Sequence, residues 1–212
     1  MKNKMKMMAG VAAALIGLSA TVQAVPTATL TLSDNNGDTT GPIAAVGGDA
    51  SFVGSLGGWT FNVAAGTSTG PGTQPIIDLS DNSTWGGGSV GNVITITWTV
   101  SNLGPLTGAY LESIGGTLNG TSDSFSVLLN GVLLPGSTLA WSSTPFSGTA
   151  TGPLSGSLPS SITLQAVLTA PKGTGAQTSF DDNLTVPDGG ATVMLLGAAL
   201  SAVGLLRRKL AA

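Results

Sequence analysis

The 212-residue chain contains no cysteine and no histidine, and only 8% of its residues are charged. The absence of cysteine excludes disulfides, thiol catalysis, iron–sulfur clusters and cysteine-ligated zinc. The absence of histidine removes the most common general base, so a serine nucleophile has no histidine to activate it. The fold therefore depends on burial and backbone hydrogen bonds, and catalysis has few side chains with which to work.

Basic residues are scarce outside the two ends of the chain. Between Val25 and Thr185 the sequence has nine acids and a single base, Lys172, so this part carries a strong net negative charge. Nucleic-acid binding requires lysine and arginine to neutralise phosphates. We therefore expect no nucleic acid among the partners of this protein.

The first 24 residues have the layout of a secretory signal peptide. Three lysines precede the apolar run Met7–Leu18, and Val22 and Ala24 place small residues at positions −3 and −1 before a cleavage site. We expect signal peptidase to cut after Ala24. A retained N-terminal anchor is the alternative, but the apolar run is too short to span a bilayer.

The tail Val186–Ala212 contains an apolar run, Ala191–Leu206, followed by Arg207, Arg208 and Lys209. As a helix the run would span about 24 Å, less than the roughly 30 Å of a bilayer core, so a helix packed on its own domain is an alternative. The basic triplet favours a membrane helix, because cations remain cytoplasmic and can snorkel to the interface. We predict a transmembrane helix at 191–206 with a basic stop at 207–209.

A turn-forming pentapeptide, Val186, Pro187, Asp188, Gly189 and Gly190, precedes that helix. Pro187 favours an extended Val186 and the glycines lack side-chain bulk, which suits a protease cleft, although an ordinary linker has the same composition. With the helix and the basic stop, the segment resembles the PEP-CTERM sorting signals, in the variant that begins Val-Pro-Asp-Ser-Gly. Gly189 stands where that variant more often has serine.

This resemblance implies a partner and a destination for the chain. The partner is an exosortase, a membrane-embedded cysteine protease or transpeptidase that removes the helix. The destination lies beyond the inner membrane of a cell that makes exopolysaccharide, so the resemblance implies an inner-membrane-anchored precursor and then a cell-surface or extracellular protein.

The interior, residues 25–185, alternates between apolar and polar residues in short runs. An Asn130-Gly131 pair between two apolar runs predicts a type I′ hairpin. Ile94, Ile96 and Trp98 share one face of a run, which argues against a disordered stalk. We predict an all-β fold, a single β-sandwich of jelly-roll or immunoglobulin-like type. The alternating runs are Thr27–Ser33, Trp59–Ala64, Asn92–Ser101, Ser160–Thr169 and Ala176–Val186.

Asp34, Asn36 and Asp38 form the one weak metal candidate in the sequence. Their spacing matches the first oxygen ligands of a calcium loop, but Thr39 and Ala45 stand where an EF-hand has glycine and glutamate. A cluster of Asp, Asn and Gly is first of all a turn. We expect a turn without a cofactor, with Ca²⁺ binding as the alternative.

Trp85, with Asp81 and Asn82 nearby, is the candidate carbohydrate contact. It precedes three consecutive glycines, a segment in which an indole ring is hard to bury, and an exposed indole can stack on sugar rings. The more common fate of such a residue is a ring that folds back over the edge of the sandwich as a hydrophobic plug. We interpret the other tryptophans, Trp59, Trp98 and Trp141, as core packing.

Four aspartates, Asp78, Asp81, Asp181 and Asp182, could form the paired carboxylates of a glycosidase. We expect them instead to be solvated turn residues, and we expect the protein not to be an enzyme. The favoured function is that of an exported structural or binding protein of the cell surface or extracellular matrix, associated with exopolysaccharide. A carbohydrate-binding module is the alternative, followed by a secreted polysaccharide hydrolase.

Overall fold

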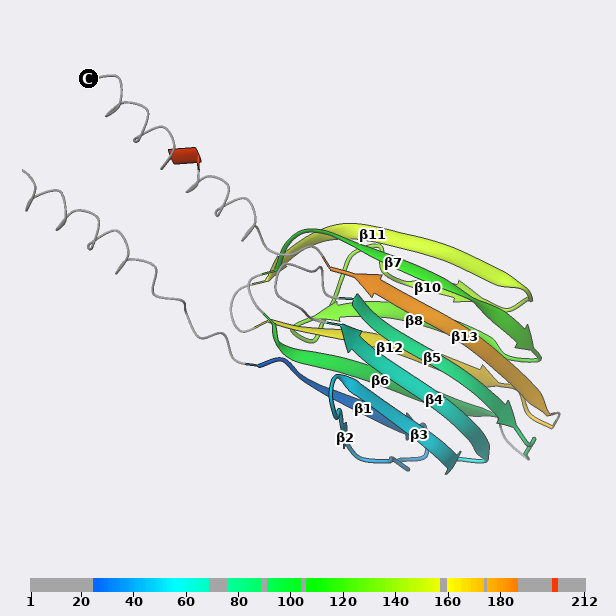
Figure 1. Cartoon of the computed structure of the whole chain (residues 1–212). Coiled ribbons are helices and arrows are strands. Elements are labelled where there is room, and N and C mark those ends of the chain that lie inside the picture. Colours follow the sequence, from blue (N-terminus) through cyan, green and yellow to red (C-terminus); the bar gives the residue numbers. More distant parts are fainter. Residues whose placement is uncertain are drawn as a thin grey trace, which may run out of the picture.

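A computed structural model describes residues 25–68, 76–88, 91–103, 106–156, 160–173, 175–186 and 200–201. These residues form two antiparallel β-sheets that pack face to face (Figure 1). The predicted β-sandwich is therefore confirmed. Within the described residues no helix is long and apolar enough to cross a membrane. The predicted signal peptide lies outside the described residues, as does the predicted tail helix except for Leu200 and Ser201.

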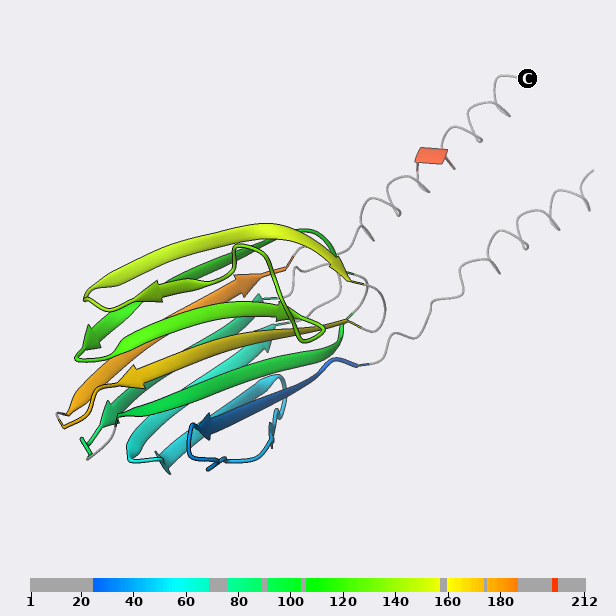
Figure 2. The ribbon, with the colours of Figure 1, turned by 180° about the vertical axis from the view of Figure 1, so that it is seen from behind.

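The first sheet, sheet A, has the strand order β10-β8-β12-β6-β1-β2, with β9 paired to the end of β8. Figure 2 shows β8, β12, β6 and β1 side by side from behind. Its strands are β1 (Thr27–Asp34), β2 (Ile43–Ala44), β6 (Asn92–Leu103), β8 (Ser122–Leu129), β9 (Val132–Leu133), β10 (Leu139–Trp141) and β12 (Ser160–Ala170).

The second sheet, sheet B, has the order β11-β7-β13-β5-β4-β3. Together the two sheets contain more strands than an immunoglobulin domain or a jelly roll. The strands of sheet B are β3 (Asp49–Leu56), β4 (Trp59–Ser68), β5 (Ile76–Trp85), β7 (Leu106–Asn119), β11 (Phe146–Gly156) and β13 (Ala176–Thr185).

The alternating runs identified in the sequence all became strands. In each of these strands every second residue points into the space between the sheets. In β6, for example, Ile94, Ile96 and Trp98 are fully buried. The predicted hairpin is also present: Leu129 pairs with Val132, and Asn130 and Gly131 both have positive φ. A two-residue turn of this kind matches the twist of the strands that it joins.

Trp98 is a core side chain that links the two sheets. Its ring lies in the core, and its indole N–H donates to the Gly66 carbonyl (3.3 Å) and the Thr67 hydroxyl (3.2 Å) of β4 in sheet B. This pairing satisfies a buried polar group that would otherwise be costly. The core prediction for Trp98 is therefore confirmed.

Candidate functional site

A surface pocket of about 260 Å³ lies at one edge of sheet A, where β8, β10 and β12 meet. Hydroxyl groups and one aromatic residue dominate its wall. The arrangement has the elements of a small-ligand site, a concave surface with several polar groups beside an apolar ring. The residues that line it are Ser122, Asp123, Ser124, Ala140, Trp141, Ser142 and Thr169.

Trp141 is held in place by other aromatic rings. Its ring stacks on Phe146 with centroids 4.8 Å apart and planes at 28°, and it lies 5.9 Å from Phe125. A Cβ on Gly148 would lie only 2.7 Å from the indole, so this glycine makes room for the ring. Trp141 is half-buried, because the rest of it forms part of the pocket wall. The sequence predicts core packing for Trp141, and its partial exposure at the pocket corrects that prediction.

Asp123 forms the deepest part of this edge. Its side chain is buried, and Oδ2 accepts a hydrogen bond from the Thr178 hydroxyl, which belongs to β13 in the opposite sheet. Burial raises the pKa of Asp123 to about 6, and the Thr178 and Thr121 hydroxyls offset part of that rise. The residue therefore ties the two sheets together beneath the pocket.

Trp85, the predicted carbohydrate contact, does not offer a face to solvent. It is the last residue of β5 rather than part of a loop, and only 5% of its surface is exposed. Its ring lies 5.9 Å from that of Trp59 and folds against Gly58, where a Cβ would come within 2.6 Å. The structure shows the hydrophobic plug, the more common of the two fates considered for Trp85, and not an exposed indole.

The neighbours of Trp85 are divided between the two faces of β5. Asp81 points into the core and is 4% exposed, whereas Asn82 points outward and is exposed. Burial raises the pKa of Asp81 to about 7, with a further rise from the charge of Asp123 and a partial offset from the Ser83 hydroxyl. Asp81 and Asn82 therefore do not form one surface with Trp85.

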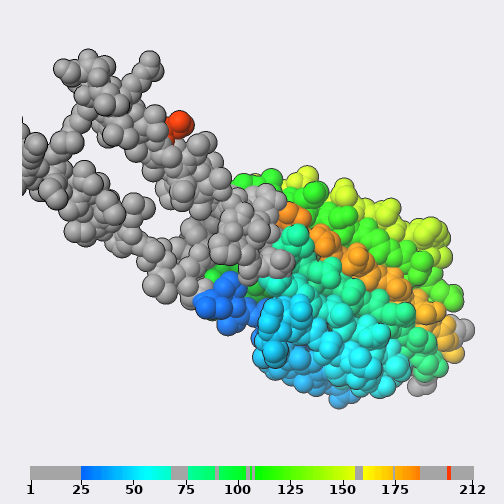
Figure 3. Space-filling view, viewed as in Figure 1, coloured from blue at the N-terminus to red at the C-terminus, as the bar shows by residue number. Residues whose placement is uncertain are grey.

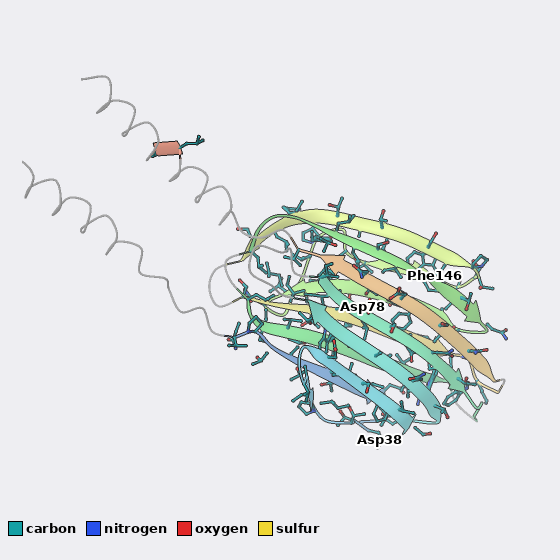
Figure 4. All side chains as sticks on the ribbon, viewed as in Figure 1. Asp38, Asp78 and Phe146 are labelled. Atoms are coloured by element: carbon teal, nitrogen blue, oxygen red, sulfur yellow. The ribbon has the colours of Figure 1, made fainter. Side chains whose placement is uncertain are left out.

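The four aspartates considered for hydrolysis lie in strands, so the expectation of solvated turns was wrong. Asp81 and Asp182 face the core, and neither has access to a substrate in this structure. Asp78, labelled in Figure 4, and Asp181 lie on the outer face of sheet B, on the paired strands β5 and β13. Figure 3 shows these two strands side by side, β5 in green-cyan and β13 in orange. Burial, followed by a hydrogen bond and charge repulsion from Asp181, raises the pKa of Asp78 to about 6.

The sequence analysis did not recognise a pair of buried acids on the inner face of sheet B. Glu112 of β7 and Asp182 of β13 are both fully buried, and neither carboxyl has a hydrogen-bond partner among the described residues. Burial raises the pKa of Glu112 to about 7. Burial and the charges of Glu112, Asp78 and Asp181 also raise the pKa of Asp182. These carboxyls are therefore inclined to hold protons.

The Asp34 loop is a hydrogen-bonded turn. The Asp34 carboxylate accepts from the backbone N–H groups of Asn36 (2.9 Å) and Asp38 (2.8 Å) and from the Asn36 amide (3.0 Å). The pKa of Asp34 is accordingly lowered. Within the described residues no group of three or more acids is placed to hold a metal. These hydrogen bonds explain the cluster without an ion, and Ca²⁺ binding stays a prediction.

Most of the predicted targeting residues lie outside the described part of the chain. The exception is Val186, which directly follows β13 and is completely buried in the core. The folded sandwich therefore continues without a linker to the point where the pentapeptide begins. The predicted targeting residues that the structure does not describe are Val22, Ala24, Pro187, Asp188, Gly189, Gly190, Arg207, Arg208 and Lys209.

Comparison with known families identifies the C-terminal segment. The VPDSG-CTERM motif matches residues 185–210, so the chain carries a PEP-CTERM-type sorting signal at this position. This finding confirms the resemblance drawn from the sequence. No curated protein matches the chain.

Solved structures that match the chain include three sugar-binding domains, all distant. A PA14 sugar-binding domain from an RTX adhesin shares 16% identity with a TM-score of 0.26, over 44% of this chain and 46% of that one. The CBM36-1 domain of a multidomain xylanase from the hindgut metagenome of Trinervitermes trinervoides shares 14% sequence identity, with a TM-score of 0.30. The match covers 62% of this chain and 100% of that domain. A family 35 carbohydrate-binding module from Clostridium thermocellum shares 16% sequence identity, with a TM-score of 0.27. The match covers 63% of this chain and 96% of that module.

The chain thus covers less than half of the adhesin chain and nearly all of the two modules. At these identities and TM-scores the likeness carries no argument about function.

Proposed function

We propose that this chain, which carries a PEP-CTERM-type sorting signal at residues 185–210, is a precursor that an exosortase cleaves and releases to the cell surface or extracellular matrix. The sorting signal is the observation that carries the proposal. Signal peptidase removes residues 1–24, and the helix at 191–206 holds the precursor in the inner membrane until cleavage. The mature product is the acidic β-sandwich.

The burial of Val186 predicts where that cleavage falls. Val186 packs into the core, so a protease acting on the folded domain reaches only the residues that follow it. We expect the mature C-terminus to lie within 187–190 and to lack 191–212. Mass spectrometry of the protein from its native producer tests this. A mature chain that ends at Ala212, in a cell with an active exosortase, would leave a simple tail anchor instead.

We further propose that the mature domain binds carbohydrate and is not an enzyme. The supporting observation is the pocket at the edge of sheet A, where the half-buried ring of Trp141 lies beside the hydroxyls of Ser122, Ser124, Ser142 and Thr169. Aromatic faces stack on the C–H faces of sugars, and side-chain hydroxyls hydrogen-bond to sugar hydroxyls. An association with exopolysaccharide would follow from such binding.

Replacement of Trp141 by Ala tests this binding, and we expect affinity for a polysaccharide that the wild type retains to fall at least about tenfold. Trp141 also packs on Phe146, so Thr169→Val supplies a second test, because Thr169 is exposed and lines the pocket. Val53→Ala, on the exposed edge strand β3, is the control. Unchanged retention in both pocket variants, measured by affinity electrophoresis, would refute a binding role for the pocket.

A further inference from the structure

The outer face of sheet A carries hydroxyl side chains in aligned rows. Strands β1, β6, β12 and β8 are adjacent and antiparallel, so outward residues that are paired in register stand side by side, about 4.8 Å apart between strands and about 6.7 Å apart along each strand. The rows are Thr29–Thr99–Thr163–Leu128, Thr31–Thr97–Gln165–Ser126, Ser33–Thr95–Val167–Ser124 and Val93–Thr169–Ser122. We call these residues the hydroxyl face.

Several hydroxyls of this face are available to a ligand. Thr99 and Thr163 share a hydrogen bond (2.8 Å), and the Thr97 hydroxyl donates to the Thr31 carbonyl (3.3 Å). The side-chain hydroxyls of Thr29, Thr31 and Thr95 make no hydrogen bond to any described residue, although all three residues are partly exposed. Threonine has few χ1 rotamers, so these donors are held in nearly fixed positions, which lowers the entropy cost of binding.

The hydroxyl face has no charged residue, in a region of the chain with nine acids and one base. The outer face of sheet B differs, because it carries Asp78 and Asp181. A polyanion would find no cation on the hydroxyl face and would be repelled by the domain as a whole. A polycation would bind the acidic residues on other parts of the domain in preference to the hydroxyl face. The chemistry that fits is an uncharged partner rich in hydroxyls.

The rows also lead into the pocket described above. Ser122, Ser124 and Thr169 belong to both, at the end of the face that lies next to β10 and Trp141. The strands of the hydroxyl face therefore form one mostly polar surface, interrupted by Val93, Val167 and Leu128, that ends at an aromatic ring. A linear polymer can contact both at once, whereas a single sugar fills only the pocket.

We infer that the hydroxyl face binds an extended, uncharged polysaccharide chain that crosses the strands of sheet A and ends at the Trp141 pocket. The inference rests on the proposed carbohydrate binding and specifies the class of polymer and the surface that takes it. Many weak hydrogen bonds along the polymer together supply the affinity. The fixed threonine rotamers favour a stiff polymer over a coiled one.

The test uses the full-length chain in mild detergent, with affinity electrophoresis against a neutral panel of mixed-linkage β-glucan, galactomannan and dextran, and against alginate as an anionic polymer. The variant is Thr29→Val/Thr31→Val/Thr95→Val, which removes three free hydroxyls while keeping β-branched side chains suited to strands. The control is Thr60→Val/Thr84→Val/Thr117→Val, three exposed threonines on the outer face of sheet B. Thermal unfolding verifies that both variants fold.

We expect the wild type and the control to bind at least one neutral polymer and the hydroxyl-face variant to bind it at least about tenfold more weakly. Binding that Trp141→Ala weakens and the hydroxyl-face variant leaves unchanged would overturn this inference and keep the pocket as the binding site. Binding of alginate alone would also overturn it while leaving carbohydrate binding in place. A wild type that binds no polysaccharide would overturn the proposed function and this inference together.

Discussion

The inner faces of the two sheets differ in the number of buried carboxyl groups that they carry. Sheet A turns an almost wholly apolar surface inward, with Leu30, Ile96 and Leu164 on three adjacent strands, and Asp123 is its main exception. Sheet B places Asp81, Glu112 and Asp182 on its inner face, across three adjacent strands. Apolar burial stabilises a fold, whereas a buried carboxyl without a partner costs free energy unless it holds a proton. Both sheets contribute apolar burial, and the buried carboxyls, most of which lie in sheet B, make the stability depend on pH.

The largest expected effect comes from removing the main core side chain of sheet A. Trp98→Ala deletes a fully buried ring and two hydrogen bonds to β4, so we expect a loss of about 3–5 kcal/mol in the free energy of unfolding. Asn82→Ala, at an exposed position of sheet B, is the control, with an expected change within about 0.5 kcal/mol. Denaturant unfolding measures both. Equal losses would show that Trp98 is not a core side chain.

The same contrast explains how much of the fold could be predicted. In β1, β6 and β12 every second residue is apolar, so the alternation identifies both the strand and its inner face. In β5 the sequence IIDLSDNSTW places Asp81 and Ser83 at inner positions, and its Asp and Asn residues resemble a turn. This segment therefore predicts a loop at Trp85 and aspartates in solvated turns, whereas the structure places them all in strands. Strands β7 and β11 are not predicted at all, because their glycines interrupt the alternation.

The candidate site was the part least accessible from the sequence. The pocket at Trp141 depends on β10 lying beside β8, a pairing between segments that the sequence does not align. The hydroxyl face depends on β12 lying between β8 and β6, which only the strand order reveals. By contrast, the sorting signal is a local motif that needs no tertiary contact for its recognition, and it was predicted from its residues alone.

A second, smaller effect should appear in the dependence of stability on pH. The pKa values of Asp81 and Glu112 rise to about 7 and that of Asp123 to about 6, while the unfolded chain releases these protons near pH 4. Stability is therefore fully present below about pH 4 and is lost as the pH rises through 6 to 7. We expect Tm to fall by roughly 10 °C between about pH 4.5 and 7.5. A Tm that rises over this range would show that the buried acids are ionised and paired.

The smallest expected effects compare two acids of sheet B, one inside and one outside. Asp182→Asn removes the ionisable group that is fully buried beside Glu112, so the folded domain no longer needs to hold a proton there. We expect the free energy of unfolding at about pH 7.5 to rise by on the order of 1 kcal/mol, with little change at about pH 4.5. Asp78→Asn alters a half-buried carboxyl that solvent already screens, and its gain should stay within a few tenths of a kcal/mol. Denaturant unfolding at the two pH values gives both numbers. If Asp78→Asn flattened the pH profile more than Asp182→Asn, the pH dependence would originate on the outer face of sheet B and not in its core.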